Sequence, residues 1–158
     1  MTLKIYFIVL LSFIMTGCMF SSGKVTVNNL KDEDKGPKKV FIENSTPYFV
    51  EMNESLKENG FTVMSQPTQV KLNEIQAKGA MSDNDESITR WGISLLTKTK
   101  GGWTCALTDS NILYFTLVLN DVSNNNSVMI LKQLGSDGPC TTIKPVFPTL
   151  CKALSENW

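Results

Sequence analysis

The four cysteines are the residues of this sequence whose types and spacing could do chemistry. They stand at positions 18, 105, 140 and 151, and the chain contains no histidine. Because histidine is the usual base of a nucleophilic triad and a common zinc ligand, its absence excludes histidine-based catalysis, metal binding and pH switching. No C-x-x-C spacing is present, which disfavours a redox or zinc centre. Lipid attachment, a disulfide and a buried thiol remain as roles.

The first cysteine ends an N-terminal targeting pattern. Lys4 gives a positive start, and Ile5–Met15 is an apolar run interrupted by Ser12. This run is too short to cross a bilayer comfortably and has the length of a secretory h-region. It ends in Met15-Thr16-Gly17-Cys18, which resembles the bacterial lipobox, with Met15 where the motif usually has leucine.

The lipobox resemblance implies a signal peptide over residues 1–17 and a cysteine, Cys18, that becomes lipid-modified and N-terminal. Its lipid would be a diacylglyceryl group with a further acyl chain, so labelled palmitate should enter the protein. Met19 follows where an aspartate would favour retention in the inner membrane. The resemblance therefore implies the outer membrane with the domain facing the periplasm, the outer leaflet of the inner membrane being the alternative. An ordinary signal peptide or an uncleaved anchor are the competing interpretations.

The remaining chain has the length of one domain and a neutral charge balance. The sequence has 158 residues, with 15 lysines and arginines against 15 aspartates and glutamates. Neutrality argues against nucleic acid as the main partner. Residues 18–39 alternate charge with glycine and proline and predict a lipidated, flexible tether, with Val25–Val27 outside the sheet. Residues 40–158 are expected to form a single periplasmic domain without a second membrane span.

The first part of this domain predicts a β-α-β unit. Val40–Ile42 reads as a buried strand, and Asn44-Ser45-Thr46-Pro47 is a helix-start signal. Asn59-Gly60 would end that helix, and Phe61–Met64 would form the second strand, parallel to the first. Residues 65–90 fit neither period well and predict only a short strand and a turn of helix.

The second part predicts an antiparallel meander of about four strands and a closing helix. The strands are expected at 91–95, 103–107, 112–119 and 127–134, with a hairpin loop at Lys98–Gly102. An apolar stripe at helical spacing runs through Phe147, Leu150, Cys151, Leu154 and Trp158. The predicted fold class is α+β, a two-layer sandwich with the helices on the sheet.

The order of these elements also resembles small envelope domains. Strand, helix ending in Asn59-Gly60, strand, hairpin and final helix are similar, over residues 40–158, to the TolB amino-terminal domain and the curli-secretion lipoproteins. Uncharacterised proteobacterial lipoproteins with a Gly-Trp-x-Cys strand, here Gly102-Trp103-Thr104-Cys105, are an equally close comparison. Both resemblances imply an envelope location.

Three cysteines remain once Cys18 carries lipid, so an oxidising compartment would leave one disulfide and one thiol. We favour a disulfide between Cys105, on a strand, and Cys140, in a loop, because Cys151 lies within the apolar helix stripe. Pairings that involve Cys151 remain open.

Other catalytic and metal-binding patterns are missing. Asp83, Asp85 and Glu86 do not form a calcium loop, since the sixth and twelfth positions hold Ile88 and Ser94 instead of glycine and glutamate. There is no G-x-S-x-G and no glycine-rich phosphate loop. The sequence predicts no catalytic residue, no metal and no cofactor.

Aromatic residues are the remaining candidates for binding. Trp91 and Trp103 are expected on paired strands, where tryptophans either fill a core or form a binding hot spot. We therefore expect a membrane-anchored envelope lipoprotein with a non-catalytic binding or assembly domain, whose partners are the membrane, through Cys18, and an envelope protein or complex. The alternatives are a hydrolase of peptidoglycan or lipid and an inhibitor of a lysozyme-like enzyme.

Overall fold

The fold was analysed in a computed structural model, which describes residues 24–32, 34–78, 89–105, 108–140 and 145–158. Its elements are β1 (Thr26–Asn29), β2 (Lys39–Ile42), α2 (Phe49–Glu58), β3 (Thr62–Met64), α3 (Gln69–Lys78), β4 (Trp91–Thr104), β5 (Asn111–Asp121), β6 (Asn126–Ser136) and α4 (Val146–Glu156). Cys18 and the acidic segment 83–86 lie outside the described residues. Within the described ranges, no helix has both the length and the apolar character needed to span a bilayer.

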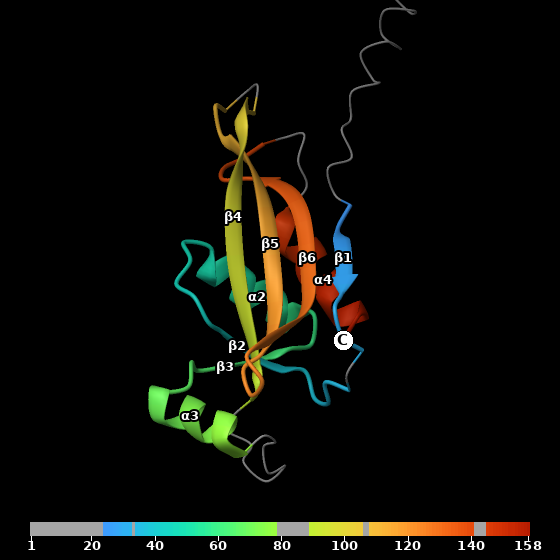
Figure 1. Ribbon diagram of the computed structural model, residues 1–158. Helices are drawn as coiled ribbons and strands as arrows, with labels where there is room; N and C mark the ends of the chain where they lie inside the picture. Colours follow the sequence, from blue (N-terminus) through green and yellow to red (C-terminus); the bar gives the residue numbers. More distant parts are fainter. Residues whose placement is uncertain (1–23, 33, 79–88, 106–107, 141–144) are drawn as a thin grey trace, which may run out of the picture.

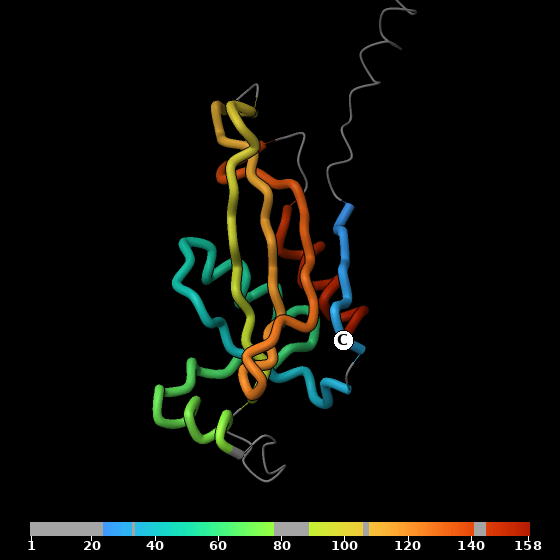
Figure 2. The backbone as a smooth tube through the Cα atoms, in the orientation of Figure 1, coloured from blue at the N-terminus to red at the C-terminus, as the bar shows by residue number. Residues whose placement is uncertain are grey.

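Six strands form one mixed sheet in the order β1-β6-β5-β4-β2-β3. β2 is parallel to both β3 and β4, and the other pairs are antiparallel. Figure 1 shows α2 and α4 on one face of the sheet, and Figure 2 shows that the chains of β4 and β5 extend beyond the other strands at one end. The predicted α+β class, β-α-β unit and C-terminal helix are confirmed. The meander is antiparallel as predicted, but in the described residues it has three strands, β4, β5 and β6, where about four were expected.

The first helix ends where the sequence predicted. Gly60 has a φ of +85°, which glycine adopts without a steric penalty. The amide of Gly60 donates to the carbonyl of Lys57, and the amide of Phe61 donates to the carbonyl of Leu56. This is the Schellman arrangement, and it turns the chain from α2 directly into β3.

The core lies between the two helices and the sheet. Leu150, Cys151 and Leu154 of α4 are fully buried, as the apolar stripe predicted. Trp158 packs its indole edge against Phe61, with ring centroids 5.0 Å apart, and against Trp91, at 6.0 Å. The end of the chain is therefore fixed to the β-α-β unit.

The expectation that Val25–Val27 stay outside the sheet was wrong. β1 pairs antiparallel with β6, with Val27 opposite Leu131. Without β1, the long strand β6 would present a row of unpaired backbone groups at the sheet edge. Pairing satisfies these groups and places Val27 against the core.

The hairpin loop expected at Lys98–Gly102 was also wrong, because β4 continues to Thr104. Its pairing with β5 becomes irregular between Thr99 and Thr104, and Gly102 has a φ of +71°. The glycines allow a bend within the strand and not a reversal of the chain.

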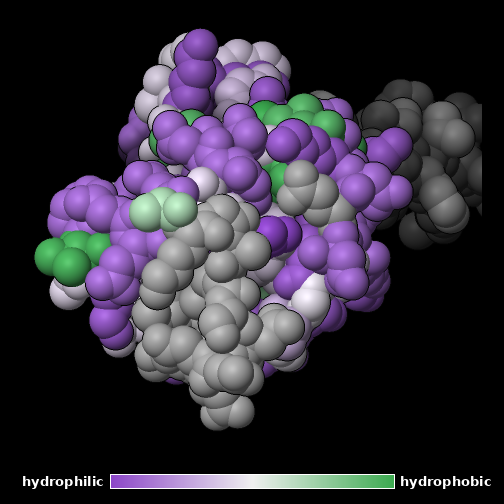
Figure 3. Space-filling model, turned by 60° about the horizontal axis from the view of Figure 1, so that its bottom comes forward, coloured by the Kyte–Doolittle hydropathy of each residue, from purple (hydrophilic) through white to green (hydrophobic). Residues whose placement is uncertain are grey.

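Residues 69–78 form a complete helix, α3, where only a turn of helix was expected. α3 lies at the end of the sheet opposite the extended part of β4 and β5 (Figure 1). Figure 3 shows the surface from this end. The described part of it is largely hydrophilic, with small separate apolar patches.

Candidate functional site

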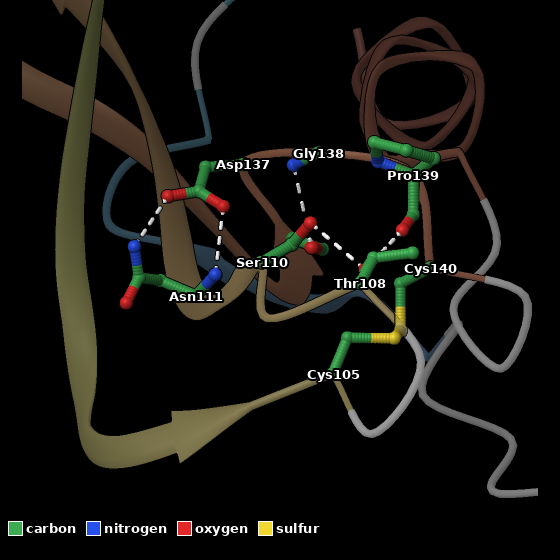
Figure 4. The surroundings of a disulfide bond; sticks show 9 residues. Cys105, Thr108, Ser110, Asn111, Asp137, Gly138, Pro139 and Cys140 are labelled. Carbon is green, nitrogen blue, oxygen red and sulfur yellow. Dashed lines mark hydrogen bonds between the residues drawn. A yellow bond between two sulfur atoms is a disulfide. The ribbon is translucent and has the colours of Figure 1, made fainter.

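A disulfide joins Cys105, just after β4, to Cys140, just after β6, with Cα atoms 5.9 Å apart. The favoured pairing is therefore present in the structure. Figure 4 shows that the bridge lies beside the turn that connects β4 and β5. It ties this hairpin to the segment that leads from β6 towards α4.

Hydrogen bonds fix the same segment on both sides of the bridge (Figure 4). Asp137 accepts hydrogen bonds from the backbone amide and the side-chain amide of Asn111, each at 2.7 Å. The hydroxyl of Thr108 donates to the carbonyl of Pro139 at 2.6 Å. These hydrogen bonds hold residues 136–140 in place, and we call this segment the wall. The side chain of Asp137 is oriented by Asn111 of β5.

This wall faces the first helix across a hollow of about 730 Å³. The hollow lies between α2, the wall and the start of α4, and Phe115 of β5 contributes to its lining. The lining residues used below are the aromatic residues Tyr48, Phe115 and Phe147, the acidic residues Glu51, Glu54, Glu58 and Asp137, and the prolines Pro139, Pro145 and Pro148. We call the hollow that they line the acidic groove.

Three aromatic rings form a cluster in the acidic groove. The ring centroid of Tyr48 lies 5.2 Å from that of Phe115 and 5.8 Å from that of Phe147. Phe115 and Phe147 are themselves 5.8 Å apart and nearly perpendicular. The pairs of Phe115 with Tyr48 and with Phe147 are edge-to-face and the Tyr48–Phe147 pair is tilted, and together they connect the start of α2, the sheet and α4 at one point.

Four carboxylates surround this aromatic cluster. Glu51, Glu54 and Glu58 are spaced by three and four residues on α2, so they share one helix face. Asp137 lies on the opposite wall. None of the described lining residues is a lysine or an arginine, so the formal charges of these described residues are all negative.

The pKa of Tyr48 reflects the negative charge of the acidic groove. Its pKa is raised above 10.0, first by burial and then by the negative charges of Asp137 and Glu51. Both carboxylates therefore act on the same hydroxyl from opposite walls. The acidic groove disfavours any added negative charge and favours a positive one.

The chemistry of the acidic groove fits an organic cation. Carboxylates bind ammonium and guanidinium groups through charge-assisted hydrogen bonds, and aromatic faces attract the same groups. A metal ion is less well matched, since no group of three or more acidic, cysteine or histidine side chains in the described ranges is arranged to hold one. Rings, prolines and carboxylates together can accommodate a ligand with both a positive and an apolar part.

The acidic groove was not predicted from the sequence. From the sequence alone, Glu51, Glu54 and Glu58 form a charged stripe of the kind that usually covers the solvent-exposed face of a helix. The available signal was that all three have the same sign and share one face. Asp137 and Phe115 could not be added to this group, since they are close to α2 only in the folded chain.

The tryptophans predicted as binding residues lie in different environments. Trp91 is 3% exposed and donates from its indole nitrogen to the carbonyl of Lys35 at 2.9 Å. Trp103 is 60% exposed, with the ammonium of Lys100 4.1 Å from its ring centroid. The two residues therefore do not form one surface, and only Trp103 is open to a partner.

The remaining described cysteine is a buried thiol. Cys151 is fully buried in α4 and takes part in no disulfide. Burial raises the pKa of its thiol to about 12, while the Ser55 hydroxyl lowers the pKa and the charge of Glu58 raises it by smaller amounts. A thiol in this state is a poor nucleophile at neutral pH.

Comparison with known proteins found a likeness to solved structures. No family model and no curated protein matches the sequence. A solved structure of a PelC dodecamer from Paraburkholderia phytofirmans is 15% identical, with a TM-score of 0.48, over 85% of this chain and 95% of that chain. A second PelC dodecamer structure from the same organism, a leucine-to-methionine variant, is also 15% identical, with a TM-score of 0.46, over 85% of this chain and 96% of that one. Likeness at this level does not establish a shared function.

Proposed function

We propose that this chain is a bacterial envelope lipoprotein whose folded domain binds another envelope component in the acidic groove and performs no chemistry on it. Lipid on Cys18 would hold the protein in the outer membrane, with the domain in the periplasm. The N-terminal pattern that ends in Met15-Thr16-Gly17-Cys18 supports the anchor. The acidic groove supports the binding role, and it is the observation on which the proposal depends.

The ligand group proposed for the acidic groove is an ammonium or a guanidinium. Glu54 and Asp137 lie on opposite walls and can approach one cation from two sides, while Tyr48 offers its ring. The interaction is electrostatic and partly exposed to solvent, so it should weaken as salt is added. Anchoring offsets a modest affinity, because a tethered binder has a high effective concentration near other membrane-bound components.

The binding proposal can be tested by NMR on the isotope-labelled chain from residue 19 onward. We expect a lysine oligomer to shift the amide signals of residues 48–58 and 136–148, and a glutamate oligomer of the same length to leave them in place. Glu54→Gln should weaken the shifts, whereas Glu74→Gln on α3 serves as a matched control on another helix. Equal shifts with both oligomers, or shifts spread over the whole domain, would refute a cation site in the acidic groove.

The anchor is tested separately in cells. Labelled palmitate should enter the wild-type protein and not the Cys18→Ala variant, and the wild type should sediment with outer-membrane markers. A photo-reactive residue in place of Glu54 should then capture a partner that the same residue in place of Glu74 does not. An unlabelled wild type found in the periplasmic fluid would remove the anchor from the proposal.

A further inference from the structure

The hairpin formed by β4 and β5 extends beyond the neighbouring strands (Figures 1 and 2). We call residues 98–104 of β4 the hairpin tip. It carries Trp103, which is 60% exposed, and Lys98 and Lys100, the latter with its ammonium over the indole ring. A large aromatic residue exposed to this degree at a protruding end requires a physical explanation.

The chain enters the domain from the same end. β4 runs towards the hairpin tip and β5 runs away from it, and β6 runs antiparallel to β5. β1 is antiparallel to β6, so it too runs away from the hairpin tip, and Thr26 is its residue nearest to that end. The residues that precede β1 therefore begin on the side of the domain where Trp103 protrudes.

The register of the sheet lets us compare how far β4 extends to Trp103 with how far the chain before β1 can reach to Cys18. Thr26 pairs with Lys132, Lys132 pairs with Thr116, and Thr116 pairs with Leu96, so Thr26 and Leu96 lie at one level. From Leu96 to Trp103 is seven residues, which span at most about 23 Å of strand. From Thr26 back to Cys18 is eight residues, which reach at most about 26 to 29 Å when fully extended. Thr104 pairs with Asn111, five residues along β5 from Thr116, so the hairpin tip rises about 17 Å above the level of Thr26. A lipid on Cys18 can therefore lie at the level of Trp103 or up to about 12 Å beyond it.

We propose that the hairpin tip contacts the phospholipid surface into which the lipid of Cys18 is inserted, so that the domain has two points of attachment. The inference rests on the proposed lipid anchor. With the strands upright, the connection is long enough to let Trp103 touch the bilayer surface and short enough to keep the hairpin tip near it. Tryptophan favours the membrane interface because its indole is both apolar and hydrogen-bonding.

The charges near the hairpin tip agree with an anionic lipid surface. Lys98 and Lys100 are attracted by anionic headgroups, and their long side chains can reach the headgroup level. Asp109, exposed on the connecting turn, opposes them with one negative charge. The end of the domain that carries α3 shows only small separate apolar patches in its described surface (Figure 3). The lipid chains on Cys18 hold the protein on the membrane. A second contact at the hairpin tip would also fix the orientation of the domain.

The experiment uses the full lipidated protein in vesicles of phosphatidylethanolamine and phosphatidylglycerol with brominated acyl chains, which quench tryptophan fluorescence on contact. We expect the wild type to be quenched and Trp103→Phe to lose most of the quenched signal. Leu96→Ala, a change of an exposed residue lower on the same strand, should leave the quenching unchanged. An inserted flexible segment of about ten residues after Ser22, which removes the limit of reach, should lower the quenching by about half or more.

Co-flotation of the protein with the vesicles separates the two proposals. If the wild type floats, Cys18→Ala does not, and quenching disappears in Trp103→Phe, both proposals are supported. If the wild type floats but its quenching equals that of Trp103→Phe, the hairpin tip does not touch the lipid, and the anchor still holds. If the wild type does not float, the anchor is refuted and the second contact is refuted with it.

Discussion

Gly92 and Glu43 lie against each other on the face of the sheet opposite α2 and α4. A Cβ atom on residue 92 would come within 2.7 Å of the Cγ of Glu43. The carboxylate of Glu43 accepts hydrogen bonds from the hydroxyl of Ser94 and, at 2.6 Å, from the side-chain amide of Asn120. Glycine at position 92 therefore makes room for a polar contact that joins the end of β2 to β4 and β5.

Gly92→Ala should destabilise the fold by about 1 to 3 kcal/mol, because the added methyl group would displace a carboxylate held by two hydrogen bonds. Chemical unfolding of the domain measures this difference. Gly101→Ala is the matched control on the same strand, since a Cβ there would meet nothing within 4 Å.

A double-mutant cycle tests whether the contact with Glu43 causes the destabilisation by Gly92→Ala. In a Glu43→Ala background the methyl group at residue 92 no longer meets a side chain, so Gly92→Ala should cost clearly less than in the wild type. If the cost is the same in both backgrounds, the contact with Glu43 is not its origin.

Replacing both Cys105 and Cys140 by serine should lower the free energy of unfolding by about 4 kcal/mol, from the chain entropy of a closed loop of this length. The measurement is urea unfolding of the oxidised protein and of the double variant. Adding a reductant should move the wild type towards the variant and should not change the variant. A wild type that is insensitive to reductant would show that the bridge does not constrain the unfolded chain.

Cys151→Ala should change how stability depends on alkaline pH. The thiol pKa is raised from 9.0 to about 12 by burial, so between these values the folded state keeps a proton that the unfolded state has lost. Stability from this group is therefore complete below pH 9 and falls at higher pH, by at most about 1.4 kcal/mol per pH unit. The wild type should lose more stability than Cys151→Ala across this window. Parallel pH profiles would contradict this assignment.

Tyr48 should titrate above an ordinary tyrosine, and Glu51→Gln should move its pKa down because one of the charges that oppose the phenolate is removed. Tyrosinate absorbance measures this in a Tyr114→Phe background of the chain from residue 19, which leaves Tyr48 as its single tyrosine. Glu74→Gln should have no effect. An organic cation bound in the acidic groove should lower the pKa of Tyr48 further. An arginine oligomer keeps its charge in the pH range where Tyr48 titrates, whereas a lysine oligomer does not, so an unchanged titration with the arginine oligomer would contradict binding next to Tyr48.

Local sequence signals predicted the elements whose causes are local. The turn at Asn59-Gly60 and the buried stripe of α4 depend on neighbouring residues, and both were predicted correctly. Lys98–Gly102 was misread because two glycines within alternating residues fit a turn as well as a bent strand. Only the pairing of β4 with β5, which runs to Thr99 and resumes at Thr104, decides between them.

The role of Asn44 depends on a contact with a distant strand, which a local sequence signal does not reveal. Its position suggested a helix start, but its side chain donates to the carbonyl of Leu95 at 2.8 Å and accepts from the amide of Leu95 at 2.9 Å. The Asn44 side chain thus makes the pair of hydrogen bonds to β4 that the backbone of one more residue of β2 would make. The acidic groove was missed for a related reason, since Glu54 and Asp137 come together only when α2 packs beside the segment after β6.

The position of β1 has a mechanical consequence. A pull on the N-terminal segment along the strand direction loads the backbone hydrogen bonds between β1 and β6 in shear, so that they resist together. The same pull directed across the sheet would open these bonds one at a time. With its leading segment fixed to a surface, the domain would therefore resist tension along the sheet better than a sideways drag.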